Sequence, residues 1–204
     1  MFAFMIKFKD NISMNEFTSC FVGIPLPDKY LGEFSDLLRR VDKTYPNLKI
    51  VDPATPHVTA YYLDKQSQNN LEEIRQVVEE NAKLLRGTNL MAGGMDTFGD
   101  SAPVVLFLPV SYQDPLVEFN RKLADGLARF MAENDNLSFH PHMTLAYFSK
   151  EETFDSWGSI KAKIEAEMNN INWEFPITEV VIYGVDSTKS PEHQEKLVTI
   201  PINE

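Results

Sequence analysis

The chain has 204 residues, 43% of them hydrophobic, which is enough to fill the core of one compact unit. Its formal net charge of −11 at pH 7 argues against a surface for long nucleic acid, because such surfaces are normally basic. No stretch approaches the roughly 20 apolar residues of a membrane span, the N-terminus is charged too early for a signal peptide, and a single cysteine, Cys20, excludes an internal disulfide.

The first part of the chain predicts a strand followed by a helix. Apolar residues alternate with others over residues 2–8, so residues 1–16 form either an extra strand or a dispensable extension. Residues 20–24 are an apolar strand candidate in which Cys20 is expected to be a buried, inert thiol. Asp28 is the predicted N-terminal cap of the helix that follows.

The next strand candidate carries a Pro-His-Val-Thr tetrad that contains His57 and Thr59, with Tyr61 and Tyr62 after it. Side chains alternate between the two faces of a strand, so His57 and Thr59 point the same way, together with Tyr61. Tyr62 points the other way, among apolar residues, and is predicted to lie in the core. The face with the histidine and the threonine is left free to line a cleft.

The middle of the chain predicts a helix, a pair of strands and a second helix. The first helix is expected near residues 69–85, and the strands at residues 88–98 and 104–110. Asp114 is the predicted cap of the second helix, with Pro115 at a plausible first helical position.

A second tetrad, Pro-His-Met-Thr, contains His142 and Thr144, and Tyr147 follows it. The same alternation puts His142 and Thr144 on one face of a strand and sends Tyr147 to the core. Beyond this strand the sequence predicts a helix and then two strands, near residues 157–168, 174–185 and 196–202.

The two tetrads belong to an internal repeat. Their histidines stand 85 positions apart (142 − 57), and the same offset aligns the apolar faces of two helices without a gap. The aligned residues are Leu31, Phe34 and Leu38 in the first half and Leu116, Phe119 and Leu123 in the second. We therefore predict an α+β fold made of duplicated β-α-β units, with antiparallel sheets and with helices outside. A pseudo-twofold arrangement would bring the two His/Thr pairs face to face across one cleft.

Two histidines and two threonines that share a cleft are sufficient to cleave a phosphodiester without a metal. One imidazole removes a proton from the nucleophile and the other protonates the leaving oxygen, while the hydroxyls donate to the non-bridging oxygens. A symmetric pair suits an RNA-type mechanism, in which a ribose 2′-hydroxyl attacks the adjacent phosphorus and leaves a 2′,3′-cyclic phosphate. We therefore predict His57, Thr59, His142 and Thr144 as the catalytic residues.

Other candidate sites are weaker. His140 and His142 have the spacing of two metal ligands on a strand, but no cluster of acidic residues or cysteines accompanies them, so no metal is predicted. His193 is expected on the surface of a polar loop. The glycines match no phosphate-binding or dinucleotide-binding loop, and no cofactor is predicted.

The chain resembles the two-histidine (2H) phosphoesterase superfamily, which includes 2′,5′ RNA ligase-like proteins and cyclic phosphodiesterases. The two tetrads carry this resemblance, together with the opening strand that runs into residues 24–27 and the turn around Phe98, and it covers nearly all of residues 17–202. It implies a single bilobal domain over residues 1–204, with the two His/Thr pairs in a central groove. It also implies metal-independent chemistry in which the histidines are acid and base and the threonines bind phosphate.

Within this superfamily the chain is most similar to phage anti-CBASS phosphodiesterases. That resemblance implies a phosphodiesterase that cleaves the 3′-5′ bonds of cyclic di- or trinucleotide immune signals, such as cyclic GMP-AMP, and so counteracts bacterial CBASS defence. A ligand of this kind needs aromatic side chains for base stacking and a cation near phosphate. We predict Tyr61, Tyr183 and Lys189 as substrate-binding residues, with Trp157 and Trp173 as weaker candidates.

Two other functions stay open at this point. The first is a 2′,3′-cyclic phosphodiesterase or a 2′,5′ RNA ligase-like enzyme that acts on RNA ends, and the second is a protein that sequesters nucleotides without turnover. In each case we expect a cytoplasmic protein, in the host bacterium if a phage encodes it. Its expected partner is a small nucleotide, without long nucleic acid, a membrane or an obligate protein partner.

Overall fold

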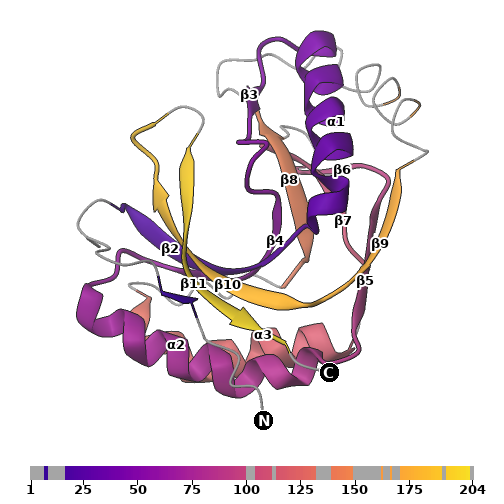
Figure 1. Ribbon diagram of the computed structural model, residues 1–204. Coiled ribbons are helices and arrows are strands. Elements are labelled where there is room, and N and C mark those ends of the chain that lie inside the picture. The colour runs from indigo at the N-terminus through magenta and orange to yellow at the C-terminus, as the bar shows by residue number, and fades with distance from the viewer. Residues whose placement is uncertain are drawn as a thin grey trace.

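The computed structural model describes residues 7–8, 17–99, 104–111, 114–131, 139–148, 162, 166, 171–189 and 192–202. Within these residues the chain forms antiparallel sheets with helices on their outer faces, which confirms the predicted α+β class (Figure 1). No helix of the described part is both long enough and apolar enough to cross a membrane.

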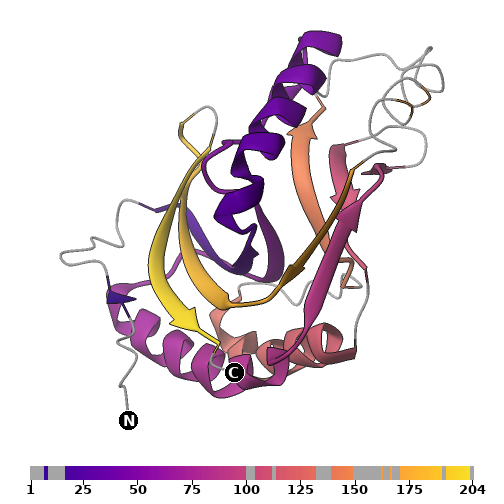
Figure 2. The ribbon, with the colours of Figure 1, turned by 45° about the vertical axis from the view of Figure 1, so that its right-hand side comes forward.

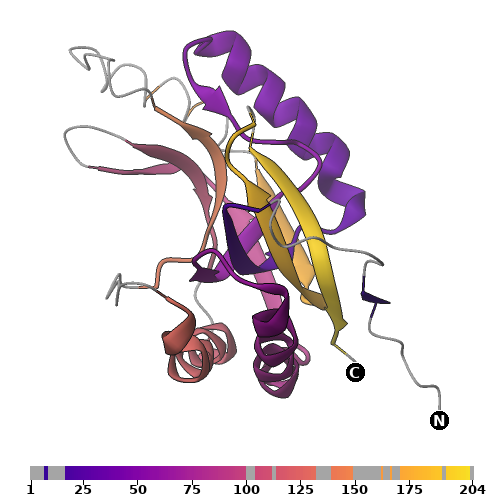
Figure 3. The same cartoon turned by 90° about the vertical axis from the view of Figure 1, so that its left-hand side faces the viewer.

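The larger sheet has five antiparallel strands in the order β1-β11-β10-β2-β4. These strands are β1 (Lys7–Phe8), β11 (His193–Pro201), β10 (Glu179–Asp186), β2 (Ser19–Pro25) and β4 (His57–Leu63). Helices α2 and α3 lie beside each other across one face of this sheet (Figure 3). Their bounds are α2 (Gln68–Ala82), continued by the 3-10 helix η3 (Lys83–Leu85), and α3 (Asp114–Leu127), continued by η4 (Ala128–Phe130). The short β1 lies at one edge of this sheet, and the choice between an extra strand and a dispensable extension for residues 1–16 stays open.

The second lobe contains a four-stranded sheet, in the order β3-β8-β7-β6, and a two-stranded sheet, β5-β9. Their bounds are β3 (Lys49–Ile50), β8 (His142–Tyr147), β7 (Val105–Pro109), β6 (Asp96–Phe98), β5 (Asn89–Gly93) and β9 (Asn172–Pro176). Helix α1 (Leu31–Thr44) packs against this lobe (Figure 2). The indole Nε1 of Trp173 donates a 2.9 Å hydrogen bond to the Glu33 carboxylate, and its ring lies near Phe34.

Each half of the repeat thus places its helix on the other lobe. Helix α1 follows β2 of the first lobe but packs on the second, whereas α3 follows β7 of the second lobe but packs on β4 of the first. The Asn120 amide of α3 donates a 2.7 Å hydrogen bond to the Ala60 carbonyl of β4. The predicted apolar faces are buried through Phe34, Phe119 and Leu123, and one core cluster runs through both lobes. This exchange holds the two lobes against each other.

Only one of the two predicted capping residues lies at the start of its helix. The Tyr30 N–H donates to the Pro27 carbonyl at 2.9 Å, which closes the 3-10 helix η2 (Asp28–Tyr30) ahead of α1. Asp28 therefore lies one turn before α1, whose N-cap is Tyr30, and the prediction that Asp28 caps this helix is wrong. Asp114 is the first residue of α3, where a carboxylate is favourable to the helix dipole.

The strand predicted at residues 88–98 is two strands in two sheets. Gly94 has φ of 71° and turns the chain between β5 and β6, so only β6 pairs with β7. Strand β5 pairs with β9, and the residue just before β9 approaches so closely that a Cβ on Gly93 would lie 2.4 Å from the Ile171 carbonyl oxygen. Similarly, the strand predicted at residues 174–185 is divided between β9 and β10. The helix predicted at residues 157–168, with Trp157, lies outside the described residues except for residues 162 and 166, which are helical.

Candidate active site

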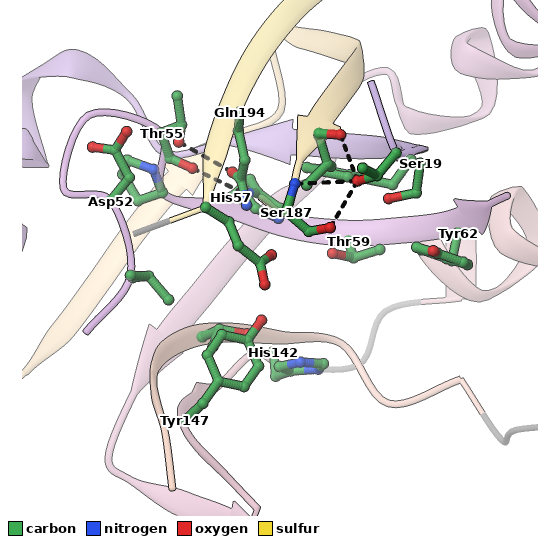
Figure 4. Close-up of a pocket in the computed structure, with 17 residues that line it drawn as sticks. Ser19, Asp52, Thr55, His57, Thr59, Tyr62, His142, Tyr147, Ser187 and Gln194 are labelled. Carbon is green, nitrogen blue, oxygen red and sulfur yellow. Dashed lines mark hydrogen bonds between the residues drawn. The ribbon is translucent and has the colours of Figure 1, made fainter. Parts of the chain in front are cut away.

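A cavity of about 400 Å³ lies between the two lobes, and both tetrads line it (Figure 4). His57 and Thr59 reach it from β4, and His142 and Thr144 reach it from β8. Their half-buried side chains alternate with fully buried ones on both strands, as the sequence pattern predicts. The structure thus brings the four predicted catalytic residues together in one cavity.

The two tetrad strands share a β-bulge at equivalent positions. On β4, Thr59 pairs with Gly23 and Tyr61 pairs with Val22, so the intervening Ala60 has no partner in the register. On β8, Leu145 is the extra residue in the same way, between Thr144 and Ala146. An extra residue reverses the alternation of side chains for the rest of a strand.

This reversal carries a tyrosine of each half into the cavity. Tyr62 and Tyr147 both line it, with 48% and 37% of their surface exposed. The prediction that these two tyrosines lie in the core is therefore wrong, because simple alternation does not continue beyond the bulge. Tyr61 is displaced in the opposite sense and packs, half-buried, against the core. It is not among the residues that line the cavity.

Each tetrad histidine is held through its Nδ1 atom by a main-chain carbonyl two residues earlier. The distances are 2.8 Å from His57 to the Thr55 oxygen and 2.7 Å from His142 to the His140 oxygen. A carbonyl only accepts, so Nδ1 carries the proton in the neutral form of both rings. The Nε2 atom of each neutral imidazole is then left with a lone pair that can accept a proton.

The surroundings of the two imidazoles are not identical. The ring of His57 stacks on Phe21 with centroids 4.4 Å apart and lies 5.4 Å from Tyr183. This burial, opposed by the Thr55 carbonyl and assisted by the charge of His142, lowers the pKa of His57 to about 4. His142 meets Phe98 edge-on at 4.8 Å, and burial also lowers its pKa. His57 is consequently the harder of the two to protonate.

The charged side chains among the cavity-lining residues of the described part are Asp52 and Glu192. Glu192 lies 3.3 Å from the Lys49 ammonium. Burial raises the pKa of Tyr147, and the negative charge of Glu192 raises it further. The other polar side chains that line the cavity carry hydroxyls, the two imidazoles or the Gln194 amide, to which the Thr55 hydroxyl donates at 3.1 Å. An anionic substrate would therefore be met here by hydroxyls and imidazoles.

The three predicted substrate-binding side chains lie outside this cavity. Tyr183 is fully buried and stacks on Phe21, because its strand β10 is covered on both faces, so it cannot contact a ligand. Lys189 is exposed and forms a 3.4 Å ion pair with Asp186. Trp173 is buried beside α1. The substrate-binding roles predicted for Tyr61, Tyr183 and Lys189 stay predictions, but none of the three lines this cavity, where Tyr62 and Tyr147 occupy the place expected for Tyr61.

The remaining candidates are placed as follows. Cys20 is buried, which raises its pKa to about 11 and agrees with an inert thiol. His193 is exposed at the start of β11, and the ring of His140 contacts Phe98 and Phe107. No cluster of three or more potential metal ligands occurs among the residues that the structure describes.

Residues 31–189 match the family model of the 2′-5′ RNA ligase superfamily. The chain belongs to this superfamily. Among curated proteins, none matches it by sequence. Its fold is similar to that of a Thermus thermophilus protein, with a TM-score of 0.71, 15% identity, and 90% of this chain and 97% of the other covered.

Two further solved structures have the fold of this 2′-5′ RNA ligase superfamily chain. Escherichia coli LigT in complex with 3′-AMP has a TM-score of 0.67 at 18% identity, with 93% of this chain and all of LigT covered. The PDE domain of MHV ns2 has a TM-score of 0.53 at 16% identity, with 80% and 98% covered. Membership in this superfamily supports a phosphodiesterase activity for the chain.

Proposed function

We propose that this protein is a metal-independent phosphodiesterase that cleaves the 3′-5′ bonds of cyclic di- or trinucleotides. The observation that carries the proposal is the convergence of two carbonyl-oriented histidines and two threonines on one cavity. A groove for long nucleic acid is not needed for a compact cyclic substrate, in keeping with the net charge of −11. We place the enzyme in the bacterial cytoplasm, where a phage would use it to remove CBASS signals.

The first chemical step is an attack of the ribose 2′-hydroxyl on the adjacent phosphorus. The Nε2 atom of one neutral imidazole accepts the hydroxyl proton, the bond from phosphorus to the 5′-oxygen breaks, and the other, protonated imidazole donates a proton to that oxygen. The hydroxyls of Thr59 and Thr144 donate hydrogen bonds to the non-bridging oxygens as their charge grows. The product is a linear nucleotide that ends in a 2′,3′-cyclic phosphate.

In a second step water opens the cyclic phosphate with the two imidazoles in exchanged roles. The imidazole that lost its proton in the first step accepts one from water, and the newly protonated imidazole donates to the leaving 2′-oxygen. A 3′-phosphate remains, and both histidines return to their starting protonation states. The near-equivalent geometry of the two tetrads suits this exchange.

His57 begins the reaction as the base in this proposal. The histidine pair has two singly protonated states, one with the extra proton on His57 and one with it on His142. The state that protonates the imidazole with the less depressed pKa is the more populated. Burial against Phe21, with Tyr183 nearby, disfavours a charge on His57 more than the surroundings of His142 do. His142 therefore starts as the acid.

A nucleotide is the substrate class that suits this cavity. Its volume of about 400 Å³ suits a compact ligand, and polar hydroxyl and amide groups line much of it. Escherichia coli LigT, which has the same fold, has been solved with 3′-AMP, with ATP and with NADP+. A 2′,3′-cyclic phosphate or a 2′-5′-linked RNA end is the alternative substrate, and nucleotide sequestration without turnover is the alternative function.

A substrate panel tests the proposal. The protein is incubated in EDTA with 3′,3′-cyclic GMP-AMP, with a 2′-5′-linked dinucleotide and with a nucleoside 2′,3′-cyclic phosphate, and the products are resolved chromatographically. We expect the cyclic dinucleotide to be consumed fastest. Faster cleavage of the 2′-5′ linkage would favour the RNA-end enzyme, and recovery of unaltered ligand from a stable complex would favour sequestration.

The pH dependence of kcat/KM should be bell-shaped, with its maximum on the acid side of neutrality. His57 must be unprotonated, so activity rises as the pH climbs through its pKa of about 4. His142 must be protonated, so activity falls as the pH rises through its pKa, which lies below the usual 6.5. The check is a profile of initial rates in buffers of constant ionic strength.

The matched variant for this profile is Phe21→Ala. Removing the stacked ring admits water to His57, so the acid limb should move to higher pH while the alkaline limb stays in place. A profile whose maximum lies on the alkaline side, or whose acid limb is unchanged by Phe21→Ala, contradicts the assignment of His57 as the base.

A further inference from the structure

One polar side chain of the cavity, the amide of Gln194, has no part in the proposed chemistry. Gln194 lies near the start of β11, where it pairs with Val185 of β10. Its half-buried side chain lines the cavity that the two tetrads share. A glutamine amide offers two N–H donors on its nitrogen and an acceptor on its oxygen. The orientation of the amide therefore decides what it can offer to a ligand.

Thr55 fixes this orientation. Its hydroxyl donates a 3.1 Å hydrogen bond to the Gln194 amide oxygen, and Figure 4 shows this bond beside the ring of His57. The oxygen is thereby occupied by a protein donor, whereas the Nε2 group donates to no protein atom within the described residues. The N–H groups are therefore the part of the amide that is left for a ligand.

The same residue holds the base of the proposed reaction. The Thr55 main-chain carbonyl lies 2.8 Å from Nδ1 of His57, while its side chain holds Gln194. The imidazole and the amide are thus fixed relative to each other through one residue. His57 accepts the proton of the 2′-hydroxyl that attacks the scissile phosphorus, so the phosphate must lie close to its Nε2 atom. A non-bridging oxygen of that phosphate is then an acceptor near the oriented N–H groups.

Neutral donors matter in this cavity because its described lining residues include Asp52 and Glu192 but no lysine or arginine. A phosphodiester that enters the cavity loses hydrogen bonds to water, and its anionic oxygens need protein donors in exchange. The hydroxyls of Thr59 and Thr144 supply one donor each. An amide that is oriented in advance supplies a further donor without the cost of reorganisation.

The second tetrad carries a different side chain at the position equivalent to Thr55. This position is His140 (55 + 85), whose carbonyl holds the histidine of its own tetrad in the same way. Its ring contacts Phe98 and Phe107 and is not among the described residues that line the cavity. The oriented amide therefore belongs to the side of the first tetrad and makes the two tetrads chemically distinct.

We propose that Gln194 is a substrate-binding residue whose amide N–H donates to a non-bridging oxygen of the scissile phosphate, and that Thr55 is its positioning residue. This proposal rests on the phosphodiesterase function above and deepens it. A contact with the scissile phosphate is made with every substrate of the enzyme. It is therefore needed both for cleavage of a cyclic dinucleotide and for opening of a nucleoside 2′,3′-cyclic phosphate.

The first test measures kcat/KM of Gln194→Ala with 3′,3′-cyclic GMP-AMP and with adenosine 2′,3′-cyclic phosphate. We expect a loss of about 30-fold with both substrates, in the range for the loss of a hydrogen bond to a charged group. Gln194→Glu should lose more than the alanine variant at neutral pH, because its carboxylate repels the phosphate. A loss confined to the cyclic dinucleotide would place Gln194 on a base or on the second phosphate and would overturn the proposal.

Thr55→Val tests the positioning role. It removes the hydroxyl but keeps the main-chain carbonyl that holds His57, so the acid limb of the pH profile should stay in place. It should lower kcat/KM about fivefold in the parent and have no effect in a Gln194→Ala background, because the two residues act as a pair. Equal losses in the two backgrounds would contradict a role of Thr55 through Gln194.

The control is Gln76→Ala on α2, an exposed glutamine outside the cavity whose amide donates to Glu72 at 3.1 Å. It should keep kcat/KM for both substrates. If Gln194→Ala and Thr55→Val lower the melting temperature but keep kcat/KM, the pair only fastens the start of β11 and the proposal is wrong. Failure of the phosphodiesterase function is distinguishable, since the unaltered protein would then cleave neither substrate and both proposals would fall.

Discussion

Replacing His57 or His142 with alanine is expected to lower kcat for a cyclic dinucleotide by about 10³-fold, within the range measured for the loss of a general acid or base. Each imidazole has its own proton transfer in each step, so neither can substitute for the other. The two losses should not add in the double variant, because residues that act as a unit give strongly non-additive effects. Initial rates at saturating substrate measure kcat for the two single variants and the double variant.

The controls for this experiment separate chemistry from folding. His57→Asn retains a side-chain N–H near the position of Nδ1, which can still donate to the Thr55 carbonyl, but it lacks a basic nitrogen. It should fold normally and be as inactive as the alanine variant. His193→Ala changes an exposed histidine outside the cavity and should retain full activity. Undiminished cleavage by the double histidine variant is incompatible with the mechanism.

Replacing Thr59 or Thr144 with valine should lower kcat by about 10²-fold, as the loss of one preorganised oxyanion donor does in other enzymes. Valine has nearly the shape of threonine, so it removes the hydroxyl with little change in packing. Thr59→Ser and Thr144→Ser restore a hydroxyl and should recover most of the activity. Rates at saturating substrate distinguish this effect from weaker ground-state binding.

The control for the threonine variants is Thr44→Val on α1, whose hydroxyl donates to the Arg40 carbonyl far from the cavity. It should be as active as the parent. If Thr59→Val and Thr144→Val raise KM but leave kcat unchanged, the hydroxyls bind the substrate and transition state equally, and the proposed stabilisation of developing charge is incorrect.

Much of the candidate site is predictable because it depends on short-range periodicity. The alternation of a strand puts His57 with Thr59, and the same alternation within the repeat puts His142 with Thr144. The structure brings all four to one cavity. The buried faces of α1 and α3 follow in the same way from the spacing of apolar residues in a helix.

The bulges are not predictable from these patterns because they depend on the register of the neighbouring strand. The residues of β4 alternate without any local sign that Ala60 lacks a partner on β2. One extra residue is enough to exchange the faces of Tyr61 and Tyr62. A residue that follows a bulge therefore cannot be assigned to a face without knowledge of its partner strand.

Two other differences between the predicted and the observed structure were indicated by the sequence. The apolar run of residues 180–185 is typical of a strand buried on both faces, which accounts for the inaccessible Tyr183. Gly93 and Gly94 interrupt the strand predicted at residues 88–98 and mark the turn between two sheets. The exchange of helices between the lobes has no such local signal, because it depends on contacts between residues distant in the chain.

A mass spectrum of the products from 3′,3′-cyclic GMP-AMP incubated with the protein in EDTA tests the central claim most directly. Attack by a 2′-hydroxyl predicts linear products that end in a 2′,3′-cyclic phosphate or a 3′-phosphate, and it predicts that an analogue lacking both 2′-hydroxyls stays intact. A 5′-phosphate product, cleavage of the deoxy analogue, or recovery of unaltered cyclic dinucleotide would contradict the account.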